Sequence, residues 1–167
     1  MRKILFFAIM SVMLFSCNNT EKEVKKITND MEDAKTWGGE SLVVKDVAHL
    51  GIYSCRLDST HVYSSGFQST FNKILNDVPK KVKVNVWVYS LQPKPDASIV
   101  VEVSNNGKSK SWKNSGLEGV LKVKEWTEVS ALFDLPSDLD INDQVKIFVW
   151  NPNKRVLYVD DLDISFE

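Results

Sequence analysis

Residue types that carry out chemistry are few in this sequence and widely spaced. It has two histidines, His49 and His61, and two cysteines, Cys17 and Cys55. The 167 residues contain no Gly-x-Ser-x-Gly, no glycine-rich phosphate loop, no His-Glu-x-x-His and no cysteine pair spaced for zinc. We therefore predict that the protein is not an enzyme and has no catalytic residues. Both histidines are then structural or surface residues, and Cys55 is a small buried one.

Acidic residues offer a second kind of chemistry, because a calcium ion binds several hard oxygen ligands. Residues 138–142 (DLDIN) resemble the opening of an EF-hand loop, but Asp143 stands where that loop requires Gly and Val149 where it requires Glu. We interpret this segment as a solvated turn. The adjacent Asp160 and Asp161 are unsuited to act as a catalytic pair, because neighbours on a strand point to opposite faces unless a bulge intervenes.

Aromatic residues are placed by an alternating pattern of apolar and other residues. In residues 82–89 (VKVNVWVY) a valine occupies every second position, which predicts a strand with an all-valine core face. Residues 145–150 (VKIFVW) follow the same rule. Six outward-facing residues of these two strands form the predicted ligand-binding set: Lys83, Asn85, Trp87, Tyr89, Phe148 and Trp150.

Exposed aromatic rings suit sugars, whose flat C–H-rich faces pack on them while neighbouring polar side chains bond to the hydroxyls. The alternative is that loops, the N-terminal segment or a partner domain cover these rings, which then form a second small core. Trp37, Tyr53 and Trp126 are predicted to be packing residues.

Further short apolar runs are separated by turn residues rich in Pro, Gly, Asn and Asp. Many short strands at such spacing predict an all-β sandwich or barrel. Residues 70–78 carry the one, weak helical pattern, and the length of residues 30–167 suits a single domain. The additional runs interpreted as strands are 52–57, 98–103, 125–133 and 156–166.

The first residues direct the protein out of the cytoplasm. A basic start and the apolar run that follows are typical of a signal peptide, which we place at 1–16. Residues 14–17 (LFSC) resemble the lipobox of bacterial lipoproteins, in which the cysteine, here Cys17, is lipidated and anchors the chain to a membrane. Ordinary secretion is the alternative. Residues 17–29 are mostly polar and are predicted to form a flexible tether.

The charge of the mature chain argues against nucleic acid as a partner. Without Arg2 and Lys3, 19 basic residues remain against 22 acidic ones, which gives a net charge of about minus three. Binding to phosphates requires clustered Lys and Arg, and the sequence has no basic stripe.

Four segments resemble the galactose-binding-like jelly roll of carbohydrate-binding modules, particularly those related to families four, nine and twenty-two. Residues 30–33 (DMED) followed by Trp37 are similar to the opening acidic strand of that group, and residues 48–54 (AHLGIYS) to its His-x-Gly-x-Tyr motif. Residues 126–129 (WTEV) resemble a core strand, and 150–152 with 158–162 a closing hairpin.

The resemblance implies an all-β jelly-roll sandwich that holds a glycan on one sheet face or in the loops at one end. It also implies a structural calcium ion between the opening and closing strands, with Glu32 and Asp160 as ligands, although Met31 stands where an aromatic is usual. It implies no other cofactor.

These features together predict a non-catalytic binding module that carries a lipid on Cys17 and is anchored to the cell envelope, at the outer membrane. Its expected partners are a glycan and the membrane. The alternative is a structural or protein-interaction lipoprotein of an envelope complex, which would bind another protein through a flat apolar patch. A third interpretation is the accessory module of a hydrolase.

Overall fold

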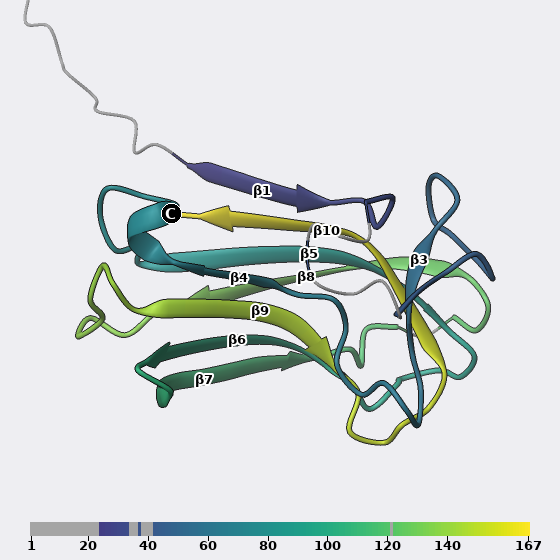
Figure 1. The fold of residues 1–167 in the computed structure, drawn as a ribbon. Helices are drawn as coiled ribbons and strands as arrows, with labels where there is room; N and C mark the ends of the chain where they lie inside the picture. Colours follow the sequence, from purple (N-terminus) through teal and green to yellow (C-terminus); the bar gives the residue numbers. More distant parts are fainter. Residues whose placement is uncertain (1–23, 34–36, 38–41, 121) are drawn as a thin grey trace, which may run out of the picture.

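The structure is a computed structural model that describes residues 24–33, 37, 42–120 and 122–167 (Figure 1). The predicted signal peptide and Cys17 lie outside the described residues. Within the described part of the chain, no helix has the length and apolar character needed to cross a membrane. The regular structure there consists of β-strands and one short 3-10 helix, η2 (Phe71–Lys73).

Two antiparallel sheets form the molecule. Sheet A has the strand order β2-β3-β10-β5-β8, and β1 also pairs with β10. Sheet B has the order β4-β9-β6-β7. The strands of sheet A are β1 (Lys25–Asn29), β2 (Val43–Val44), β3 (Ser54–Leu57), β5 (Lys81–Ser90), β8 (Trp126–Asp134) and β10 (Leu157–Phe166). Those of sheet B are β4 (Phe67–Thr70), β6 (Ser98–Asn105), β7 (Lys108–Gly116) and β9 (Gln144–Trp150).

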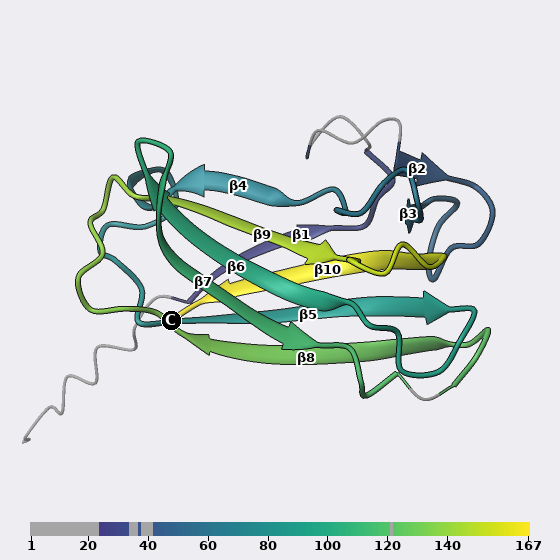
Figure 2. The ribbon, with the colours of Figure 1, turned by 90° about the horizontal axis from the view of Figure 1, so that it is seen from below.

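The sheets lie face to face, and their inward side chains make one core (Figures 1 and 2). In β5 the alternating valines are fully buried, and β9 alternates in the same way. Each such valine stabilises the fold by roughly 1.5–3 kcal/mol through the removal of its surface from water. The predicted all-β sandwich of the jelly-roll type is confirmed.

The structure differs from the sequence prediction where a strand lacks a strong pattern of its own. Residues 25–29, assigned to the tether, form β1 and pair with β10 from Lys25↔Phe166 to Asn29↔Leu162. Strand β7 (KSKSWKNSG) contains no aliphatic residue and was not predicted. Both are strands because a neighbour offers free backbone N–H and C=O groups to pair with. The helical pattern at 70–78 yields only η2.

Strand β10 changes partners halfway along one of its edges. Residues 157–159 pair with β3, and residues 162–166 pair with β1. On the opposite edge, the pairing with β5 is interrupted by a bulge between Asp160 and Asp163, where Asp161 has a positive φ of 44°. The bulge therefore changes the direction of the Asp160 and Asp161 side chains, at the point where the partner of β10 changes from β3 to β1.

Candidate functional site

The six predicted ligand-binding residues lie on two different sheets. Strand β5 of sheet A carries Lys83, Asn85, Trp87 and Tyr89, and β9 of sheet B carries Phe148 and Trp150. Within each strand the alternation is as predicted. The outer faces of the two sheets point in opposite directions, however, because the sheets share their inner faces. The predicted residues therefore do not form one site.

On sheet A the aromatic rings pack against a loop. The His49 ring stacks on Trp87, with ring centroids 3.7 Å apart and planes 15° apart, and Trp126 meets His49 edge-on at 5.6 Å. Tyr89 contacts the rings of Trp126 and Tyr158 at 5.5 and 5.9 Å. This is the arrangement of the alternative interpretation, in which the rings make a second small core.

Polar contacts of the Trp126 and His49 rings also hold that loop on sheet A. The Trp126 Nε1–H donates to the Ala48 carbonyl oxygen at 3.0 Å, and His49 Nδ1 lies 2.6 Å from Asp161 Oδ2. Because the loop is attached at both points, the rings of β5 are part of the packing of this face.

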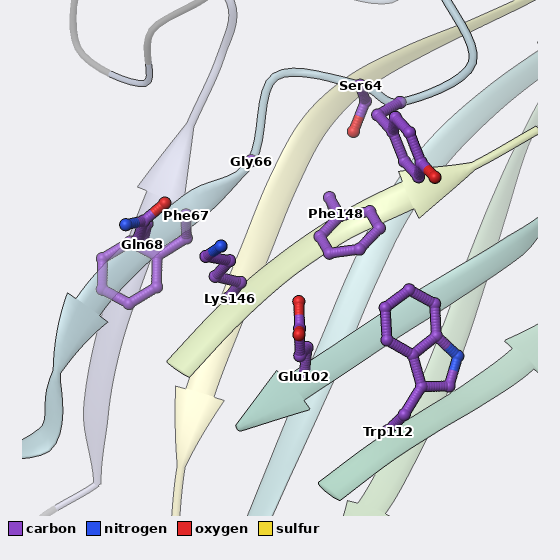
Figure 3. A pocket seen from close by; sticks show the side chains of 9 residues that line it. Ser64, Gly66, Phe67, Gln68, Glu102, Trp112, Lys146 and Phe148 are labelled. Carbon is purple, nitrogen blue, oxygen red and sulfur yellow. The ribbon is translucent and has the colours of Figure 1, made fainter. Parts of the chain in front are cut away.

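The outer face of sheet B is hollowed instead. A cavity of about 350 Å³, called the groove below, crosses all four strands (Figure 3). Its floor follows one row of register partners across the sheet: Gln68 opposite Lys146, Lys146 opposite Glu102, and Glu102 opposite Trp112. The residues that line it are Tyr63, Ser64, Gly66, Phe67, Gln68, Glu102, Trp112, Lys146 and Phe148.

Aromatic rings form one side of the groove. Phe148 lies between Tyr63 and Trp112, with ring centroids 5.6 and 5.8 Å away, and both neighbours meet it edge-on. Trp150 meets Trp112 at 6.1 Å. Tyr63 and Trp112 keep 51% and 44% of their surface exposed. Edge-to-face contacts fix the ring orientations and leave ring surface open to a ligand.

One aliphatic residue on the outer face of sheet B is fully buried beside these rings. Val100 is paired with Phe148 on one side and with Asn114 on the other, and it has no exposed surface. It is not part of the core cluster between the sheets. Its burial on the outer face shows that the side chains around it, including Phe148, cover this part of sheet B.

Three polar side chains in the groove have no side-chain partner among the residues that the structure describes. Lys146 and Glu102 come from neighbouring strands and point toward the groove (Figure 3). They are register partners of opposite charge, yet neither they nor Gln68 has a side-chain hydrogen bond or ion pair within the described part of the chain. Their donors and acceptors are available to hydroxyl groups of a ligand.

The wall of the groove beside β9 is held close by a glycine and a serine. A Cβ on Gly66 would lie 2.7 Å from the Ile147 carbonyl oxygen and 2.8 Å from the Phe148 Cβ, so only glycine permits this approach. Ser64 N–H donates to the Val149 carbonyl oxygen at 2.9 Å, and Ser64 Oγ accepts from Val149 N–H at 2.9 Å. The segment that carries Tyr63 is thereby fixed against β9.

Sequence reasoning missed Trp112 and Tyr63. Trp112 lies in the polar strand β7, where no apolar alternation marks a strand. The turn at 105–107 (NNG) was the available signal, because such a turn between two extended segments predicts a hairpin and so a partner for β6. Tyr63 lies outside the named strands and is joined to Trp150 by an isolated bridge, which only the tertiary structure reveals.

Both predicted calcium ligands, Glu32 and Asp160, accept hydrogen bonds from backbone N–H groups of residues 49–53. Glu32 Oε1 accepts from the N–H groups of Ile52 and Tyr53 at 2.7 and 2.8 Å. Asp160 Oδ2 accepts from His49 N–H at 2.8 Å, and its Oδ1 from Asp161 N–H at 2.8 Å.

Burial raises the pKa of Asp160 to about 6 against the lowering effect of these two hydrogen bonds. Among the described residues, no group of three or more His, Cys, Asp or Glu could hold a metal ion. Since calcium takes six to eight oxygen ligands, the described side chains do not complete such a site. The calcium ion stays a prediction of the resemblance.

Comparisons with known proteins agree with the fold. A scan against models of protein families found no match, and a search of curated proteins found none. Solved structures do match. The CBM22-1 xylan-binding domain of Paenibacillus barcinonensis Xyn10C has 12% sequence identity and a TM-score of 0.50, over 74% of this chain and 78% of that one.

Two further matches have lower TM-scores. A family 16 carbohydrate-binding module has 12% identity and a TM-score of 0.46, over 73% of this chain and 82% of that one. The C-terminal family 22 carbohydrate-binding module of Clostridium thermocellum Xyn10B has 12% identity and a TM-score of 0.45, over 75% of this chain and 79% of that one. At 12% identity, the likeness to the CBM22-1 domain, with its TM-score of 0.50, shows the β-sandwich fold that the sequence resemblance implied.

Proposed function

We propose that this domain is a non-catalytic carbohydrate-binding module that holds a glycan in the groove on the outer face of sheet B. The observation that carries the proposal is the combination, in one cavity, of the exposed Tyr63 and Trp112 rings with three polar side chains that have no partner among the described residues. These are Gln68, Glu102 and Lys146. Ring faces take the apolar side of a sugar, and the polar side chains take its hydroxyls.

The shape of the groove favours a chain of sugars over a single one. The groove crosses four strands, from Gln68 in β4 to Trp112 in β7. Neighbouring strands are about 4.8 Å apart, so these three steps span roughly 14 Å. An extended oligosaccharide fits such a length, and it would contact the polar row and the aromatic side together.

The single carboxylate among the described residues of the groove supports binding over hydrolysis. Hydrolysis of a glycosidic bond normally requires two carboxyl groups, about 5 to 9.5 Å apart, on either side of the bond. Among the described residues that line the groove, Glu102 is the one carboxylate. It can accept a hydrogen bond from a sugar hydroxyl, but it has no second acid with which to share catalysis.

The location belongs to the same proposal and rests on the sequence. The signal peptide at 1–16 and the lipobox-like residues 14–17 support export and a lipid on Cys17, and so a module at the outer surface of a membrane of the cell envelope. Globomycin inhibits the peptidase that cleaves bacterial lipoproteins, so treated cells should accumulate the uncleaved precursor. The protein with Cys17→Ser should no longer be found in the membrane fraction of the cells.

The first experiment is a glycan array with the chain from residue 17 that carries Cys17→Ser, with xylan-type and β-glucan oligosaccharides included. Xylan-type chains come first because one structural match is described as xylan-binding. We expect a related set of glycans to bind. Trp112→Ala should weaken binding at least about tenfold, or about 1.4 kcal/mol, through loss of an exposed ring.

Trp87→Ala is the matched control, because it removes the same ring type from the outer face of sheet A. We expect it to bind glycans as the unmodified chain does. Unchanged glycan binding by Trp112→Ala would contradict the proposal that the glycan binds in the groove. Loss of binding by a folded Trp87→Ala variant would contradict it as well. No binding to any glycan would favour the structural or protein-interaction lipoprotein instead.

A further inference from the structure

A second hollow lies on the same face of sheet B, at the end of the sandwich where β6 turns into β7. Its volume is about 470 Å³, and it is called the polar hollow below. Thr70, Ser104 and Gln144 contribute to its lining from three strands. The turn at 105–107 and the loop before β9 complete it, at the left end of the ribbon in Figure 1.

The polar hollow adjoins the groove in register. Thr70 is opposite Gln144, and Gln144 is opposite Ser104. This row lies two residues along the strands from the row of Gln68, Lys146 and Glu102. Two residues of a strand span about 7 Å and bring the side chains back to the same face. The two cavities are therefore neighbours, displaced along the strands.

The direction of that displacement matters. The groove runs across the strands, whereas the polar hollow lies to one side of it along the strands. A linear chain that follows the groove passes the polar hollow without entering it. A substituent that leaves such a chain sideways, along the strands, can fill both cavities.

Ser104 is the observation that points to a ligand. Its side chain is only 7% exposed and lines the polar hollow, yet its hydroxyl has no hydrogen-bond partner within the described part of the chain. The Gln144 amide beside it has none there either. Among the described side chains, Arg56 Nε is the one atom that is both fully buried and without a hydrogen-bond partner, so the Ser104 hydroxyl and the Gln144 amide stay accessible. A ligand in the polar hollow can therefore bond to both groups.

The rim of the polar hollow is held in place by a buried carboxylate. Asp143 has no exposed surface. It accepts hydrogen bonds from Asn105 Nδ2 at 2.6 Å, from Lys110 Nζ at 2.7 Å and from Asp140 N–H at 2.7 Å. These contacts join the β6–β7 turn to the loop before β9. The cavity therefore has walls that are ordered before any ligand arrives.

The chemistry of the lining indicates what fits. Its described residues carry hydroxyl groups, side-chain amides and the Asp140 carboxylate, and no aromatic ring. Thr70, Asn105 and Asn142 already bond to other protein groups. The side chains of the lining without a partner in the described part of the chain are those of Ser104, Asn106 and Gln144, and a hydroxyl-rich neutral group can bond to them. We propose that the polar hollow is a subsite for a single-sugar branch on the glycan whose backbone lies in the groove, which rests on the proposed function.

The test compares matched linear and branched oligosaccharides by isothermal titration calorimetry. The pairs are xylotetraose with and without an arabinofuranosyl branch, and cellotetraose with and without xylosyl branches. For at least one pair we expect the branched form to bind about five- to tenfold more tightly, as one or two additional hydrogen bonds would produce.

Ser104→Ala with Gln144→Ala should remove that advantage and leave the affinity for the linear form unchanged. Ser130→Ala, on the outer face of sheet A, is the control and should change neither affinity. Thermal unfolding of each variant shows that the fold is kept.

Equal affinities of the unmodified chain for the linear and branched forms would overturn the branch subsite. An equal loss of affinity for both forms in the double variant would overturn it as well. In either case the glycan-binding groove still stands, because Trp112→Ala should weaken both forms. If the unmodified chain binds none of the four oligosaccharides, the branch subsite falls, and the glycan array decides separately on the proposed function.

Discussion

Individual aromatic residues in this sandwich have different roles because of the sheet that carries them. Trp87 and Trp112 both lie on outward positions of a strand. Trp87 is stacked under His49, whereas Trp112 keeps 44% of its surface exposed beside Phe148. A ring that is already covered contributes to stability, and a ring that is open can contribute to binding.

The residue-scale prediction concerns Trp87. Replacement by Ala removes its stacking on His49 and the contact that holds the loop on sheet A. We expect the free energy of unfolding to fall by about 2 kcal/mol, less than for a fully buried Trp because the side chain is only half-buried. Urea unfolding followed by circular dichroism measures the loss. An unchanged midpoint would mean that the ring cluster is not a packing unit.

At the scale of elements, β1 shows how pairing recruits a weakly apolar segment. Its sequence is KKITN, with only Ile27 packed against the core, yet all five residues pair with β10. The segment orders because β10 continues beyond the end of β3 and would otherwise leave an unpaired edge. Residues 25–29, which the sequence placed in the tether, are therefore a strand of sheet A.

The element-scale prediction compares chains that begin at residue 24 and at residue 30. The shorter chain loses the pairing with β10 and the burial of Ile27. We expect its free energy of unfolding to be at least about 2 kcal/mol lower, from the lost apolar burial alone. A chain that begins at 24 with Lys25→Ala is the control, because Lys25 is exposed. Equal stability of the two lengths would show that β1 is dispensable.

For the whole molecule, one buried carboxylate links the elements at the end of the sandwich. Burial alone would raise the pKa of Asp143, but hydrogen bonds from Asp140 N–H, Lys110 and Asn105 outweigh it and hold the pKa below the ordinary value. Because the folded pKa is depressed, Asp143 contributes stability above the ordinary aspartate pKa of about 3.9. That contribution is lost as the pH falls below this value.

The matching prediction is measured by urea unfolding from pH 6 to pH 2. At pH 6, Asp143→Asn should lower the free energy of unfolding by about 3 kcal/mol, because Lys110 and Asp140 N–H lose an ionised acceptor. The difference between the two proteins should narrow as the pH falls below about 3.9, because Asp143 of the unfolded chain is then protonated and the stabilisation from its ionised folded form is lost. A difference that does not depend on pH would contradict the depressed pKa.

The sequence alone determined the properties that depend on local alternation. The valines of β5 and the aliphatic residues of β9 identified the core side of each strand, because side chains alternate strictly along a strand. The turn residues between the runs indicated many short strands, and so an all-β sandwich. These conclusions require no knowledge of which strands are neighbours.

Only the tertiary structure decided which residues share a surface. Phe148 and Trp87 carry the same sequence signal, but strand pairing places them on opposite sides of the molecule. Trp112 enters the groove through the polar strand β7, and the bulge in β10 brings Asp160 and Asp161 to one loop. Sheet membership arises from pairing between segments far apart in the chain, and a local period of two carries no information about it.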